Sequence, residues 1–167
     1  MIIKYIKHAD VTLSDINEIV KIKMTAWHYP ENEQIAWIRN NIQPNDIHVL
    51  LLDENNRAVA YLNLVVIDII INESKTDAYG IGNVCATEKG KGYGSLLMQE
   101  INNFFQRNNA IGLLFCKDNL VRFYFRFKWK IVKTPELSTR LNREQINTMI
   151  YNYNNYINNF KYQGRNF

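Results

Sequence analysis

The residues best suited to chemistry lie in a basic, glycine-rich loop between a strand-like run and an apolar, helix-like pattern. Glycine lets the main chain approach a ligand without side-chain interference, and two lysines add positive charge. Backbone N–H groups at the start of a helix bind anions such as phosphates. We therefore expect an anion-binding loop here. It comprises Lys89, Gly90, Lys91, Gly92, Tyr93, Gly94 and Ser95.

Two common phosphate-binding loops do not fit this spacing. A Walker loop needs Ser or Thr directly after Gly-Lys, whereas Gly92 follows Lys91 here. The dinucleotide fingerprint Gly-x-Gly-x-x-Gly fails because Gly94 comes one residue too early. The loop is therefore of neither kind.

A third pattern does fit the loop. It resembles motif A of the GNAT N-acetyltransferase superfamily, (Arg/Gln/Lys)-x-x-Gly-x-(Gly/Ala), with Lys89, Gly92 and Gly94 in register. Upstream, the run from Val84 to Ala86 resembles the family's Val-x-Pro strand end, with alanine in place of the proline. The resemblance implies that loop and strand end bind acetyl-CoA, the acyl donor. The strand-end residues implied are Asn83, Val84, Cys85 and Ala86.

A second segment extends the resemblance. The stretch from Asn119 to Trp129 resembles the family's motif B, in which an asparagine precedes Phe-Tyr and, after three intervening residues, Gly-Phe follows; Lys128 replaces that glycine. The resemblance implies that Asn119 binds the pantetheine arm and that Tyr124 protonates the CoA thiolate. A phenol pKa of about 10 and a thiol pKa of about 8.5 would allow this transfer without large shifts. The structural alternatives are a helix N-cap for Asn119 and a core aromatic for Tyr124.

Apolar periodicity predicts alternating strands and helices. A capping signal at Thr12–Asp15 precedes the first helix. The order βααβββαβαββ indicates an α/β fold with a mixed central sheet flanked by helices, as in the acetyltransferase fold. We expect strands at 2–6, 47–52, 58–71, 79–86, 111–115, 130–132 and 148–153, with a turn at 72–77. The first helix has Ile16, Ile19, Val20, Met24 and Trp27 on its apolar face. A second helix carries Ile35, Ile38 and Ile42, and a third, after the glycine-rich loop, carries Leu97, Ile101 and Phe104. A fourth helix starts at Asn119.

Length and composition set the wider limits. Residues 1–167 are expected to form one domain, with a loosely ordered tail at 155–167. No run of ~18 apolar residues predicts a membrane helix, and no signal peptide is evident, so we expect a cytoplasmic protein without a membrane partner. Cys85 and Cys116 have neither metal-ligand spacing nor a disulfide framework, and we expect both to be buried.

The net charge of +4 suits an anionic ligand such as coenzyme A but does not indicate a nucleic acid. The basic, aromatic stretch from Arg122 to Lys130 could stack bases. Phe123, Tyr124 and Phe127 recur at helical spacing, however, and are better explained as core residues. We expect no nucleic-acid partner, and a homodimer is left open.

The resemblance implies direct attack of an amine on the thioester of acetyl-CoA. Backbone N–H groups near Asn83–Cys85 would stabilise the oxyanion. The general base is open: Asp77, Glu73, Asp68, His28 or a water molecule would serve. The acceptor, expected to be a small-molecule amine, is unidentified. Trp27, His28, Tyr29 and Trp37 could line its pocket, and Glu31 and Glu33 could attract a cation.

Three function classes remain open at this point. The first is an N-acetyltransferase, with acetyl-CoA or a longer acyl-CoA as donor. The second is a catalytically silent CoA-binding module of the same fold, and the third is a basic nucleic-acid-binding domain. No metal is expected. A route through an acetyl-cysteine would need an activated thiol, and no His or Asn lies at a recognisable spacing to activate either cysteine.

Overall fold

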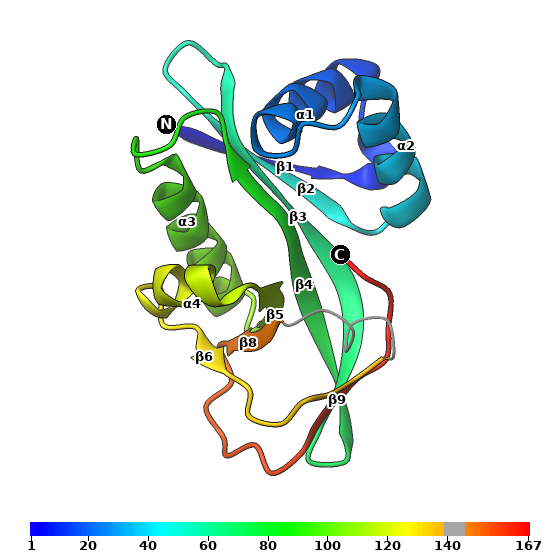
Figure 1. The fold of residues 1–167 in the computed structure, drawn as a ribbon, viewed down its shortest axis with the longest axis vertical. Coiled ribbons are helices and arrows are strands. Elements are labelled where there is room, and N and C mark those ends of the chain that lie inside the picture. Colours follow the sequence, from blue (N-terminus) through cyan, green and yellow to red (C-terminus); the bar gives the residue numbers. More distant parts are fainter. Residues whose placement is uncertain (139–145) are drawn as a thin grey trace. The chain divides into compact units, whose positions relative to one another are not determined.

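The computed structural model describes residues 1–138 and 146–167, in which helices and strands alternate (Figure 1). The helices are α1 (Leu13–Ala26), α2 (Glu31–Asn41), α3 (Tyr93–Arg107) and α4 (Asp118–Phe125), and His8–Asp10 form a 3-10 turn. The strands are β1 (Ile2–Lys7), β2 (Ile47–Leu52), β3 (Ala58–Ile71), β4 (Ser74–Ala86), β5 (Ile111–Cys116), β6 (Lys130–Ile131), β7 (Glu136–Leu137), β8 (Asn147–Tyr151) and β9 (Phe160–Tyr162). None of the described helices is long and apolar enough to cross a membrane.

The described strands form one sheet in the order β1-β2-β3-β4-β5-β8-β6, with β9 on β3 and β7 on β9. β4 and β5 pair in parallel, while β1–β2, β2–β3 and β5–β8 are antiparallel. The predicted α/β fold with a mixed central sheet is therefore confirmed. The two short strands β7 and β9 add to the predicted order.

The chain divides into two compact units, and both long strands contribute to each. The first unit contains residues 1–65, 82–100 and 167, and the second contains residues 66–81 and 101–166. In the first unit, α1 and α2 lie side by side (Figure 1) and pack on β1, β2, β3 and β4. This core consists of Ile6, Ile19, Val20, Ile22, Ile38, Ile42, Leu50, Leu52, Tyr61 and Cys85.

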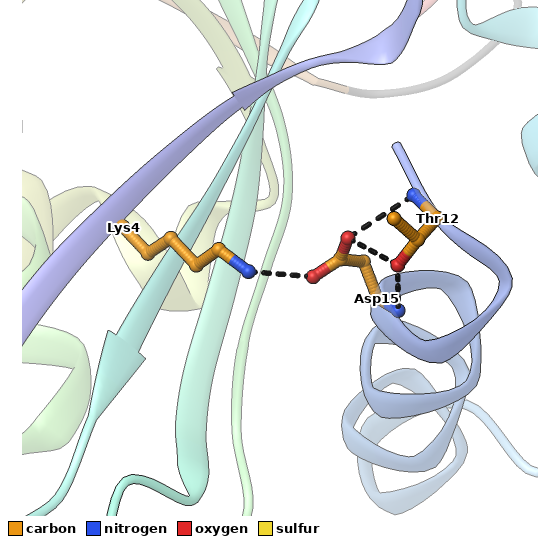
Figure 2. Close-up of polar contacts among 3 residues, drawn as sticks. All are labelled: Lys4, Thr12 and Asp15. Carbon is orange, nitrogen blue, oxygen red and sulfur yellow. Dashed lines mark hydrogen bonds and ion pairs between the residues drawn. The ribbon is translucent and has the colours of Figure 1, made fainter. Parts of the chain in front are cut away.

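The start of α1 is fixed by a capping box, as its sequence predicts. The Thr12 hydroxyl accepts a hydrogen bond from the Asp15 backbone N–H at 3.2 Å, and an Asp15 carboxylate oxygen accepts one from the Thr12 backbone N–H at 3.1 Å. Lys4 Nζ on β1 lies 2.7 Å from the other Asp15 oxygen (Figure 2). Burial opposes ionisation, but the bonds from Lys4 and Thr12 outweigh it and lower the pKa of Asp15. The ion pair thus links the helix start to the edge strand.

The second unit is organised around an aromatic cluster. The Phe105 ring on α3 lies 6.1 Å from that of Trp129, which stacks on Tyr151 of β8 at 5.4 Å between centroids. A Cβ at Gly112 would lie 2.6 Å from both the Phe105 and the Trp129 rings. Glycine at this position of β5 therefore lets the two rings cover the strand.

Two segments differ from the pattern expected from the sequence. The turn predicted at 72–77 is confined to Asn72 and Glu73, with φ of 49° and 66°, the left-handed pair of a two-residue hairpin turn. β4 therefore starts at Ser74. In the region expected to be a loose tail, β9 pairs with Ile70–Ile71. The Asn72 side chain helps to fix this region, because its Oδ1 accepts a hydrogen bond from the backbone N–H of Asn158 at 2.8 Å.

Candidate functional site

The glycine-rich loop connects β4 to α3 within the first unit. Gly90 and Gly92 have φ of 83° and 79°, in the left-handed region that favours glycine. No other atom lies within 4 Å of a Cβ built at either position, so main-chain conformation rather than crowding requires these glycines. Lys89 and Lys91 are exposed. At the start of α3, the Leu96 N–H donates a hydrogen bond to the Gly92 carbonyl at 3.0 Å, and the loop thus leads directly into a helix N-terminus.

The end of β4 extends past its pairing with β5. The ladder between the two strands covers Ala78–Ile81, and β4 continues through Gly82–Ala86. The main chain of Gly82–Ala86 therefore lies outside this ladder. Gly82 is itself tightly enclosed, because a Cβ there would collide with the main chain of Phe167 and lie 3.2 Å from Asn63 Oδ1.

Asn83 has an unusual main-chain conformation for a residue inside a strand. Its φ is 54°, a left-handed value that is uncommon outside glycine, although asparagine tolerates it better than most residues. Its side chain is held at both ends: Nδ2 donates to Asn63 Oδ1 at 2.7 Å, and Oδ1 accepts from Lys23 Nζ at 2.8 Å. The strand end predicted to carry the oxyanion donors is thus locally distorted and fixed by side chains.

Sequence reasoning missed two residues of this site, Asn63 on β3 and Lys23 on α1. The second is the more unusual. It is only 2% exposed, and its Nζ lies 4.0 Å from the centroid of the Trp37 ring and 5.8 Å from that of Trp27. Burial lowers the pKa of Lys23 to about 8, partly opposed by the charge of Cys85. Among the described residues, no carboxylate lies within ion-pair distance of this amine.

A helical pattern in the sequence could have located Lys23. Position 23 follows Ile19 by four residues and precedes Trp27 by four, so it lies on the same helix face. The prediction placed Met24 on that face instead, and Met24 is 39% exposed. A lysine in register with an apolar face is therefore the signal that was overlooked.

A second buried polar chain runs through the first unit. His8 Nδ1 lies 2.8 Å from His48 Nε2, and His48 Nδ1 lies 2.8 Å from the Tyr61 hydroxyl. His48 and Tyr61 are fully buried, whereas His8 is partly exposed. Burial, with smaller effects from nearby charges, lowers the pKa of His48 to about 4, and burial raises the pKa of Tyr61. Both groups are therefore uncharged at neutral pH.

The predicted motif B residues lie in the second unit. Asn119 is exposed and is not the N-cap of α4, because that cap is Lys117. Tyr124 is 6% exposed, with its ring against Phe123 at 5.1 Å and Trp129 at 6.5 Å between centroids. Burial, and secondarily the charge of Cys116, raises the pKa of Tyr124 well above its usual value. The expectation of an unshifted phenol is therefore wrong: Tyr124 is a weaker acid and stays protonated at neutral pH.

The turn after α4 has the conformation that the family's glycine would favour. Lys128 has φ of 64°, and the Trp129 N–H returns to the Tyr124 carbonyl at 3.3 Å. Asn102 braces the same turn, donating to the Phe127 carbonyl at 2.8 Å and accepting from Trp129 Nε1 at 3.1 Å. The turn therefore forms although lysine stands where the family has glycine, and the left-handed φ of Lys128 is a source of local strain.

The candidate general bases all lie on the surface. Asp77, Glu73 and His28 are exposed, and Asp68 pairs with Lys75 Nζ at 2.9 Å, with both side chains more than half exposed. None of these four side chains is buried. The structure thus gives none of them an environment that favours it as the base.

Of the four aromatic residues suggested for an acceptor pocket, two pack inside the first unit and two do not. Trp27 and Trp37 pack against its core and against Lys23, whereas His28 and Tyr29 are exposed. Glu31 and Glu33, in the first turn of α2, are also exposed. The tryptophans are therefore partly buried residues that pack against the core and contact a buried amine.

The cysteines are buried, as predicted. Burial raises the pKa of Cys85 to about 12, against a smaller opposing effect of Lys23, and that of Cys116 to about 11. Thiolate is the nucleophilic form of cysteine, so neither residue is suited to carry an acetyl group. Among the described residues, no cluster of three His, Cys, Asp or Glu side chains could hold a metal ion.

Comparison with known proteins gives a family match over most of the chain. The model described as "Acetyltransferase (GNAT) domain" matches residues 8–132, a span that includes the loop, the β4 end and motif B. No curated protein sequence matches the chain.

Solved structures show the same fold. An acyl-CoA N-acyltransferase from Pseudomonas aeruginosa is similar over 90% of this chain and 99% of its own, with a TM-score of 0.63 and 16% identity. A GNAT family acetyltransferase from Brucella melitensis, in complex with acetyl-CoA, matches 96% of each chain at a TM-score of 0.59 and 14% identity. An aminoglycoside 6'-N-acetyltransferase complexed with coenzyme A matches 90% of this chain and 94% of its own, with a TM-score of 0.62 and 11% identity.

Proposed function

Because the chain belongs to the GNAT family of acetyltransferases, we propose that it transfers the acetyl group of acetyl-CoA to a primary amine of a small molecule. The observation that carries this proposal is the loop between β4 and α3. Its two left-handed glycines, Gly90 and Gly92, present main chain rather than side chains at a helix N-terminus, an arrangement that binds phosphate groups. Lys89 and Lys91 supply charge for the pyrophosphate of the donor.

In the proposed reaction, the neutral amine nitrogen attacks the thioester carbonyl carbon, and a C–N bond forms while the carbonyl oxygen becomes negative. The carbon–sulfur bond then breaks, the thiolate gains a proton and the nitrogen loses one. Backbone N–H groups of Asn83–Cys85, beyond the β4–β5 ladder, would receive the oxyanion. One such donor is typically worth ~3 kcal/mol, and alignment of two bound substrates about 7–11 kcal/mol.

Tyr124 is the proposed proton donor to the CoA thiolate. Its hydroxyl is protonated at neutral pH because burial raises its pKa. The raised pKa reduces the driving force for this transfer, so we infer that the hydroxyl first donates a hydrogen bond that strengthens as charge develops on sulfur and gives up its proton as the carbon–sulfur bond breaks. The elevated pKa values of Cys85 and Cys116 favour direct attack over an acetyl-cysteine intermediate.

The acceptor is proposed only as a class. Similarity to an aminoglycoside 6'-N-acetyltransferase supports a small amine, and the identity of 11% supports no narrower choice. A panel of polyamines, aminoglycosides, amino acids and peptide N-termini, assayed for CoA release, would define it.

The test has two parts. Calorimetric titration should show acetyl-CoA binding to the wild-type chain, and the amine panel should show turnover. Binding without turnover on any amine would identify a silent CoA-binding module instead. Absence of acetyl-CoA binding would overturn the proposed function. Preferential binding of short oligonucleotides would favour the nucleic-acid alternative.

A further inference from the structure

The distorted end of β4 needs a source of stabilisation. Asn83 adopts a left-handed φ of 54° inside a strand, and strained conformations of this kind persist only where the surroundings enforce them. The strain lies at the residue where the proposed oxyanion donors begin. What holds Asn83 in this conformation therefore bears directly on the proposed activity.

Two buried side chains hold Asn83 from opposite ends of its amide. Asn63, on β3, is 0% exposed and accepts the Asn83 Nδ2 bond at 2.7 Å; Lys23, on α1, is 2% exposed and donates to Asn83 Oδ1 at 2.8 Å. We call these three residues the Asn83 clamp. Because both partners are shielded from solvent, water cannot readily replace either bond, and loss of one would leave a buried polar group unpaired.

Burial of Lys23 costs free energy that a purely structural role does not explain. An ammonium group buried without a carboxylate is disfavoured, and its surroundings consist of the Trp27 and Trp37 rings, with Cys85 of β4 and His48 of β2 as the titratable groups that interact with it. An apolar residue would fill the same space without this penalty. What lysine adds is a long side chain that reaches from the helix to the Asn83 amide.

We propose that Lys23 is a positioning residue for acetyl transfer: its amine holds the Asn83 side chain, and thereby the left-handed main chain that directs the N–H groups of Asn83–Cys85 to the thioester oxygen. The inference rests on the proposed function and deepens it. It assigns Lys23 no direct contact with substrate. The amine can donate to Asn83 Oδ1 in either protonation state, so the clamp does not require the charge.

A double-mutant cycle tests this assignment, because glycine adopts a left-handed φ without help. Lys23→Met should lower kcat by roughly 10- to 100-fold, a part of the ~10²- to 10³-fold effect of an oxyanion donor, with the KM for acetyl-CoA changed less than about threefold. Asn83→Gly should keep activity within about tenfold of wild type. Lys23→Met added to Asn83→Gly should cost little further activity, giving the non-additivity of coupled residues.

Three controls keep the result interpretable. Lys21→Met removes an exposed lysine of the same helix, paired with Glu18 at 2.8 Å, and should be silent. Lys23→Gln keeps an N–H donor and should retain more activity than Lys23→Met, and it serves as the second variant if methionine prevents folding. The pH profile of kcat/KM should keep its shape in Lys23→Met, because a positioning residue does not set the protonation of the reaction.

The opposing outcomes are distinct. If Lys23→Met costs as much in the Asn83→Gly background as in wild type, or removes a rise of kcat/KM with pH that is centred near pH 8, Lys23 acts as a base and the inference is wrong. Unchanged kcat in Lys23→Met also overturns it. A wild-type chain that binds no acetyl-CoA overturns the proposed function instead. An active wild type whose kcat is unchanged by Lys23→Met overturns the clamp alone.

Discussion

Buried Lys23 predicts an unusual gain in stability at alkaline pH. Burial lowers its pKa from 10.5 to about 8, whereas in the unfolded chain the amine keeps its ordinary value. Between these two values the unfolded state binds more protons than the folded state, so the free energy of unfolding rises with pH. At about 1.4 kcal/mol per pH unit, the full contribution of Lys23 is about 3 kcal/mol, gained between pH 8 and pH 10.5.

Urea denaturation of wild type and Lys23→Met at pH 7, 8, 9 and 10.5 measures this contribution. Titration of tyrosines, cysteines and other lysines affects both chains alike, so the difference between their unfolding free energies isolates position 23. That difference should move in favour of wild type by about 3 kcal/mol across the series. The control is Lys21→Met, on the exposed face of the same helix: this chain keeps Lys23, so the difference between wild type and Lys21→Met should not rise by ~3 kcal/mol across the series. A difference that stays constant with pH would refute the burial of a charged amine at this position.

The remaining predictions concern the acidic range, the loop and the proton donor. Burial lowers the pKa of His48 from 6.5 to about 4, so its contribution to stability is present above pH 6.5 and is lost as pH falls towards 4. Relative to His48→Gln, the free energy of unfolding of wild type should fall by about 3 kcal/mol between pH 6.5 and pH 4. Parallel acid-unfolding curves of the two chains would contradict this assignment. Gly92→Asp should abolish acetyl-CoA binding in calorimetry, while Gly92→Asn, similar in shape and backbone preference but uncharged, should weaken it less; equal loss would show that charge repulsion from a pyrophosphate is not involved. Tyr124→Phe should lower kcat by roughly 10²- to 10⁴-fold with little change in acetyl-CoA affinity, and the defect should shrink at low pH; near wild-type turnover would assign the proton to another donor.

Much of the fold was predictable because it follows from local patterns. Thr12 and Asp15 predicted the capping box of α1, and period-two and period-3.6 apolar residues located the long strands and the helices. The sequence predicts too long a turn after β3, because the polar residues that follow Asn72–Glu73 are also typical of a loop. Those residues instead continue β4 on its exposed side, where polarity carries little information about strand ends.

The candidate site was predictable only where a continuous motif marks it. The loop glycines lie within five consecutive residues, and the positive φ values of Gly90 and Gly92 are ones that glycine readily adopts. The Asn83 clamp, in contrast, joins residues separated by 60 and 20 positions, and no local pattern signals such a contact. The raised pKa of Tyr124 depends on burial in the folded chain, which a motif does not encode.

The division of β3 and β4 between the two units has a consequence for how the chain is made. The first unit needs residues 82–100 to complete the contacts begun by residues 1–65, and residues 66–81, which intervene, belong to the second unit. On a ribosome, α1 and α2 therefore emerge long before the β4 end that covers part of their core. Exposed apolar surface during this interval favours association with chaperones or other chains. Synthesis rate and chaperone supply should thus affect the yield of folded protein more than they would for a domain built from consecutive segments.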